Sequence, residues 1–319
     1  MRMALKRIYL DQRDWVALAR QHYGRSHDDT IAGVLAMVRE ASESGHASFP
    51  LSAVHYQETY HHRNPDRRRR LGAFMAEISR FHAIAGATDL LAAEVHVAIS
   101  ALTGATPNRA PVPFGIGAKH AFKQMNGYFT DPETERRAIA QFGADAVSGY
   151  FEKALLMGPE EQLPFAGIAL PKREFSQRQL DFERGTASKL RQWGHTSDRA
   201  HRLVLAQEAH DIVAPLNAEI AAGSHIRGLV DDRAALTDFM MSLPAKAAIC
   251  RMRMSAHEDK NFRWHLGDLN DITALGTAAA YCDVVVAEKH WGSILRRHAP
   301  YLTAQVTSDL RDLPQLLLT

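Results

Sequence analysis

Five acidic residues fall where an expected strand ends or an expected helix begins. They are Asp11, Glu58, Asp268, Asp271 and Glu288. Carboxylates that gather in one place repel each other, so they normally coexist around a hard divalent cation. The two cysteines have no metal-ligand spacing, and a ligand set made of oxygen alone favours Mg²⁺ or Mn²⁺ over zinc. The acids therefore predict a magnesium or manganese site.

Helix capping is the competing interpretation of the same residues. Asp11 and Asp14 have the spacing of a capping box at a helix start, and so do Asp268 as N-cap and Asp271 at the third helical position. Asp271 also lies on the apolar stripe of its helix, which directs a carboxylate towards the buried side. We expect Asp14 to be structural and Asp11 to be functional.

The elements that would position these acids alternate between short strands and helices. Four strands are expected, at Arg7–Leu10, Ala47–Leu51, Val284–Ala287 and Ala304–Thr307. We expect a parallel sheet in which the first and third strands are adjacent near the centre, with helices on both faces. Ligands of open α/β sheets bind beyond the carboxyl ends of the strands. The fold class is therefore α/β, and Asp11 follows a strand at the edge where ligands bind.

The 319 residues, of which 46% are hydrophobic, suffice for one large domain or two ordinary ones. The stretch TGATPNRAPVPFGIG contains three prolines and three glycines, which predict a break in regular structure. From there to Pro244 the pattern is helical. We therefore expect a core built from residues 1–102 and 245–319, interrupted by a large helical insertion at residues 103–244.

An arginine-rich stretch follows Glu58, although the formal charge of the whole chain is only +2. Its candidate nucleic-acid contacts are Arg63, Arg67, Arg68 and Arg70. A solvated helix face is one explanation of such a run, and contact with phosphate groups is the other.

The sequence also predicts a protein of the cytoplasm. Two cysteines cannot form a disulfide framework. No segment approaches the run of about 18 apolar residues that a membrane span needs, and the first residues lack the pattern of a signal peptide.

The order of strand and Asp11, helix and Glu58, helix and Asp271, strand and Glu288 resembles that of PIN-like nuclease domains. The segments YLDQRDW and DLNDITALGTAAAYCDVVVAEKHW carry most of the resemblance. It implies a three-layer core with a short parallel sheet, and it implies hydrolysis of RNA phosphodiester bonds with Mg²⁺ or Mn²⁺. Asp11, Glu58 and Asp271 would be ligands, with Asp268 as a further or bridging ligand. Glu288 would hold a second ion or orient water.

Two features depart from the PIN-like pattern. Glu58 and Asp268 are 268 − 58 = 210 positions apart, so an insertion must interrupt a core that is usually compact. The fourth acid is usually an aspartate shortly after a threonine, whereas here Ala287 and Glu288 occupy that place.

The expected function is a divalent-metal-dependent endoribonuclease of the kind that serves as a toxin or defence effector. An inhibitory protein partner and a homo-oligomer are both compatible with this function. One alternative is a catalytically silent PIN-like module that binds RNA or a protein. Another is a helical ribonuclease resembling HEPN domains, because Arg251 and His257 have an Arg-x5-His spacing.

Overall fold

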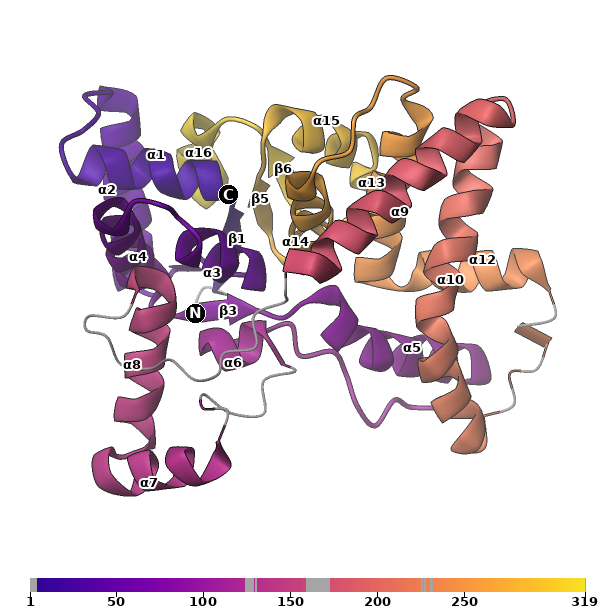
Figure 1. The fold of residues 1–319 in the computed structure, drawn as a ribbon, viewed down its shortest axis with the longest axis horizontal. Helices are drawn as coiled ribbons and strands as arrows, with labels where there is room; N and C mark the ends of the chain where they lie inside the picture. Colours follow the sequence, from indigo (N-terminus) through magenta and orange to yellow (C-terminus); the bar gives the residue numbers. More distant parts are fainter. Residues whose placement is uncertain are drawn as a thin grey trace.

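The computed structural model describes residues 5–123, 129, 131–158, 173–224, 226, 228–229 and 232–318. Its fold is α/β, with a short four-stranded parallel sheet among many helices (Figure 1). The strand order is β2 (Ala47–Ser48), β1 (Lys6–Leu10), β5 (Val284–Val286) and β6 (Gln305–Thr307). All three pairings are parallel. The predicted sheet is confirmed, with β1 and β5 adjacent at its centre.

The alternation of side chains along β1 divides the core into two layers. Ile8 and Leu10 belong to one apolar cluster, whereas Tyr9 belongs to the other. The first cluster contains side chains of α1 (Gln12–His22), α2 (Asp29–Glu43) and α4 (Pro65–Ser79). The second contains side chains of α13 (Pro244–Glu258), α14 (Leu266–Tyr281) and α15 (Lys289–Arg297). Both faces of the sheet are covered, which explains why β5 consists of three buried valines.

The second strand is shorter than expected because Pro50 interrupts it. Proline has no N–H to donate to a ladder, and the chain changes partner at this point. Leu51 forms a parallel bridge with Ala83 of β3 (His82–Ile84). β3 pairs in turn, antiparallel, with β4 (Phe114–Ile116). The expectation that the proline- and glycine-rich stretch contains no regular element is therefore wrong, because β4 lies within it.

The helices between residues 103 and 244 pack in two separate groups (Figure 1). α8 (Ala144–Met157) packs on α3 (Ala53–Tyr60) and on α4, where Gly72 allows the close approach of the Leu156 carbonyl. α10 (Ser197–Ala221) packs on α5 (Ala87–Thr103) and α13. The remaining helices of this stretch are α6 (Gly117–Ala121), α7 (Pro132–Phe142), α9 (Arg173–Gln192) and α12 (Arg233–Ser242).

A buried ionic network joins α9, α10 and α13. Arg253 pairs with Glu208 and, at 2.5 Å, with Glu183. Lys246 contacts Glu208 at 2.5 Å and Asp211 at 2.7 Å. These paired charges fix the second group of helices on the core.

The chain ends with a 3-10 turn at Ala299–Tyr301, β6, a second 3-10 turn at Leu310–Asp312, and α16 (Leu313–Leu318). No helix in the described ranges is both long and apolar enough to span a membrane.

Candidate active site

Asp11 connects the carboxyl ends of the two central strands. Its backbone N–H donates to the carbonyl of Val286 at 3.0 Å, and its Oδ2 accepts from the backbone N–H of Glu288 at 3.2 Å. Although Asp11 is the N-cap residue of α1, its side chain makes no capping hydrogen bond, in contrast to Asp28 at the start of α2. The competing interpretation of Asp11 and Asp14 as a capping box is therefore not supported. The carboxylate of Asp11 points across the sheet edge instead.

Two more acids reach this edge from helices on the chain's two halves. Glu58 of α3 accepts a hydrogen bond from Asn270 Nδ2 at 3.4 Å. Asp271 of α14 accepts one from Trp291 Nε1 at 3.0 Å. The sequence did not identify Asn270 or Trp291 as site residues. Their only local signal is proximity, since Asn270 precedes Asp271 and Trp291 follows Glu288 by three positions.

The pKa shift of Asp271 shows that the charges of three other carboxylates act on it. The pKa of Asp271 is raised to about 8, first by burial and then by the charges of Asp11, Glu288 and Glu58. The pKa of Glu58 is raised mainly by burial, with a contribution from Asp11. Burial also raises the pKa of Asp11. We call this group, Asp11, Glu58, Asp271 and Glu288, the carboxylate edge.

The donor chemistry of the carboxylate edge fits a hard divalent cation. All four groups offer oxygen, which is what Mg²⁺ and Mn²⁺ prefer, and a bound cation would offset both the burial and the repulsion that raise the pKa of Asp271. The ligand shell is incomplete, because no three His, Cys, Asp or Glu side chains in the described ranges have an arrangement that could hold an ion. The side chains would have to close around one.

Asp268 does not join the carboxylate edge. Its Oδ2 accepts from the backbone N–H of His265 at 2.6 Å, and the His265 ring lies 3.5 Å away. α14 begins at Leu266 with His265 as N-cap, so Asp268 is the third residue of a capping box. The expectation that Asp268 is the N-cap, with Asp271 as its partner, is wrong because the helix begins three residues earlier than the sequence indicated.

The four candidate arginines have different surroundings. Arg68 donates to the carbonyl of Tyr60 at 3.2 Å and to that of Met157 at 3.4 Å, so it holds α4 against α8. Arg63 is exposed in the connection between α3 and α4. Arg67 and Arg70 line a pocket beside α1.

The Arg-x5-His pair of α13 lies in two different environments. The Arg251 guanidinium stacks on the ring of Tyr301 at 4.4 Å. The His257 side chain is fully buried, and its Nε2 lies 2.7 Å from a carboxylate oxygen of Glu183. The two side chains therefore have separate partners and form no common site.

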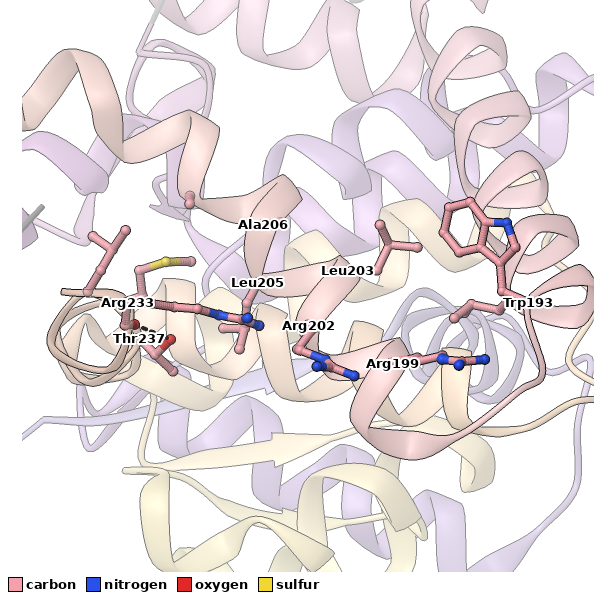
Figure 2. Close-up of a pocket in the computed structure, with 12 residues that line it drawn as sticks. Trp193, Arg199, Arg202, Leu203, Leu205, Ala206, Arg233 and Thr237 are labelled. Carbon is pink, nitrogen blue, oxygen red and sulfur yellow. Dashed lines mark hydrogen bonds between the residues drawn. The ribbon is translucent and has the colours of Figure 1, made fainter. Parts of the chain in front are cut away.

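A hollow of about 530 Å³ lies between α9, α10 and α12, and Figure 2 shows the residues around it. Trp193 and several leucines make it largely apolar, and Arg199, Arg202 and Arg233 are its charged residues. None of its described lining residues is an aspartate, glutamate, histidine or cysteine. It lacks the acid and base groups of a catalytic centre. We take the carboxylate edge as the candidate active site because its acids are electrostatically coupled.

Comparisons of the chain with models of protein families, with curated proteins and with solved structures gave no match.

Proposed function

We propose that the protein is a PIN-like, divalent-metal-dependent endoribonuclease that hydrolyses RNA phosphodiester bonds. One observation carries the proposal. Four carboxylates from separate elements lie near the carboxyl ends of the central strands, and burial together with the charges of the other three raises the pKa of Asp271 to about 8. An arrangement so unfavourable without a cation is typical of a functional site.

Each residue of the carboxylate edge has a role in this proposal. Asp11, Glu58 and Asp271 hold a Mg²⁺ or Mn²⁺ ion, and Glu288 orients water or contributes to a second ion. When bound, such an ion neutralises charge on the attacked phosphate and activates water. Trp291 orients Asp271 through its hydrogen bond, as groups behind a metal ligand commonly do.

The proposed partner is RNA, in a cytoplasmic setting that two buried, unpaired cysteines support. A role as a toxin or defence effector, held in check by an inhibitory protein, belongs to the same proposal.

Cleavage of single-stranded RNA by the full chain in Mg²⁺ or Mn²⁺ tests the proposal. Asp271→Asn should lower the cleavage rate at least about 100-fold, because it removes a ligand charge. Asp268→Asn is the matched control on the same helix. It retains an acceptor for the His265 amide, so its rate should stay within about threefold of wild type. Equal rates for wild type and Asp271→Asn would disprove the proposed site.

A catalytically silent module that binds RNA or protein is the second candidate. Two observations favour it, namely the incomplete ligand group in the described ranges and the glutamate at position 288. Titration calorimetry separates the candidates, because a silent module would show no heat with millimolar Mg²⁺ while still binding RNA.

A further inference from the structure

A pocket of about 420 Å³ lies between α1 and the first turns of α4. Its polar lining consists of four arginines, one histidine and one tyrosine, namely Arg20, Arg25, Arg67, Arg70, His62 and Tyr23. No aspartate or glutamate is among the residues of the described chain that line it. A hollow surrounded by charges of one sign concentrates ions of the opposite sign. We call it the basic pocket, and its charge suits an anionic ligand.

Three of its guanidinium groups are free to bind a ligand. Within the described ranges, no carboxylate pairs with the side chain of Arg20, Arg25 or Arg67. Arg69, on the same helix but outside the pocket, is paired with Asp66 at 3.3 Å. A guanidinium group can donate two parallel hydrogen bonds to a phosphate, which makes arginine the preferred residue for this anion. The unpaired arginines therefore suit a phosphate group as the ligand.

The basic pocket and the carboxylate edge lie along one face of α1. Val16, Ala19, Arg20 and Tyr23 line the pocket at the spacing i, i+3, i+4 and i+7. Gln12 is four residues before Val16 on the same face, at the end of α1 that adjoins the carboxylate edge. Eight residues of helix separate Gln12 from Arg20, which corresponds to about 12 Å along the axis.

Polar and aromatic groups lie along this face of α1. Gln12 Nε2 donates to Thr59 Oγ1 at 3.0 Å, directly beside Glu58 in the chain, whereas Gln12 Oε1 is buried without a partner in the described ranges. Tyr23 is 36% exposed, and its hydroxyl donates to the Arg70 carbonyl at 3.1 Å. An anchored, exposed aromatic ring beside a phosphate site can stack a nucleic-acid base.

We propose that the basic pocket binds an internal backbone phosphate of the RNA strand whose scissile bond lies at the carboxylate edge, with a base stacked on Tyr23. The inference rests on the proposed function, and it adds the place where the strand is held. The positively charged groups supply affinity and register, and the carboxylates about 12 Å away along α1 supply the chemistry.

Binding of RNA to the full chain in a chelator, where no cleavage occurs, tests the proposal. The probe is a fluorescent single-stranded RNA, with and without a 5′-phosphate, and inorganic phosphate is the competitor. Arg20→Gln and Arg67→Gln should each weaken binding about tenfold, because each removes charge-assisted hydrogen bonds. Each should also reduce the slope of log affinity against log salt by about 0.7. Arg69→Gln makes the same charge change outside the pocket, and it should leave the slope unchanged.

Three results would overturn the assignment. Equal losses of affinity for Arg69→Gln and Arg67→Gln would show only a general electrostatic attraction of the RNA. A dependence on Arg67 that is restricted to 5′-phosphorylated RNA would assign the pocket to a terminal phosphate. If inorganic phosphate bound to the pocket without displacing RNA, the pocket would be a site for a free phosphate ligand. Asp271→Asn should bind RNA like wild type in the chelator, so loss of cleavage and loss of this binding can be distinguished.

Discussion

Replacing Asp271 by asparagine removes one negative charge from the carboxylate edge while keeping the size of the side chain. Asparagine can still accept the hydrogen bond from Trp291 Nε1. We expect metal-free Asp271→Asn to be more stable than metal-free wild type at high pH. We also expect the variant to lose the stabilisation by Mg²⁺.

The magnitude follows from the raised pKa of Asp271. The pKa rises from 3.8 to about 8, and one unit corresponds to about 1.4 kcal/mol, so the ionised group costs the folded protein at most about 6 kcal/mol. Asp271 is only partly buried, and solvent screens part of this energy. We therefore expect Asp271→Asn to increase the free energy of unfolding by about 1–3 kcal/mol at pH 9.

The pH dependence has a defined sign. Between about pH 4 and pH 8 the folded wild type keeps a proton on Asp271 that the unfolded chain has already lost. Its stability therefore falls as the pH rises through this window, and the full loss is reached above the folded pKa. Asp271→Asn lacks this slope, so the two proteins should be almost equally stable at pH 4 and differ most at pH 9.

Urea unfolding at a series of pH values, with a chelator and then with Mg²⁺, measures both effects. Wild type should gain about 2.7 kcal/mol when the Mg²⁺ concentration is 100 times the dissociation constant, whereas Asp271→Asn should gain much less. Asp268→Asn should show the wild-type response. If Asp271→Asn and wild type had the same pH slope and the same gain in Mg²⁺, Asp271 would not belong to a coupled carboxylate group that holds a cation.

Three further substitutions test separate parts of the structure. Gly72→Ala should lower the free energy of unfolding by about 1–3 kcal/mol, because the new methyl group would overlap the carbonyl oxygen of Leu156. Arg253→Met should lower it by about 3–5 kcal/mol, because the cation shared by Glu183 and Glu208 is lost and each buried glutamate keeps only one partner, His257 or Lys246. Trp291→Phe should weaken Mg²⁺ binding about tenfold in calorimetry, because Asp271 loses the hydrogen bond that orients it.

Matched variants separate these effects from general damage. Gly33→Ala has open space around the new methyl group, and it should stabilise α2 by about 0.5–1 kcal/mol. Arg251→Met removes a charge from the same helix as Arg253 but only a stacking contact, so it should cost about 0.5–1 kcal/mol. If Gly72→Ala and Gly33→Ala had the same free energy of unfolding, α4 and α8 would not be closely packed.

The sequence predicted the central sheet because its signals are local. The apolar runs of β1 and β5 are followed at once by Asp11 and by Ala287–Glu288, and parallel strands bring such positions to one edge. β4 was not predicted because it lies in a stretch rich in proline and glycine, and β3 was not predicted because it pairs with that strand and with Leu51. The start of α14 was misplaced because histidine is not a favoured N-cap residue, so His265 carried no signal.

In the candidate site, too, some residues have a local sequence signal and others have none. Its acids were candidates because Asp11 and Glu288 follow strands and Glu58 and Asp271 lie in the early turns of helices, whereas the residues that position them gave no such signal. Trp291 and Asn270 become site residues only when α15 and α3 meet α14. Arg20 and Arg25 carried no signal of their own, because an arginine on a helix face is usually solvated, and only the packing of α4 beside α1 encloses them.

The pairing of β1 with β5 also determines when the carboxylate edge can form during synthesis of the chain. Ile8 lies beside Val284, and 284 − 8 = 276 positions separate them. At about 5–20 residues per second, β1 waits roughly 14–55 s for its central neighbour to leave the ribosome. Asp271 and Glu288 arrive in the same late segment. The first half of the chain therefore holds its two acids apart from the other two, and no nascent chain carries a complete carboxylate edge before its C-terminal segment folds.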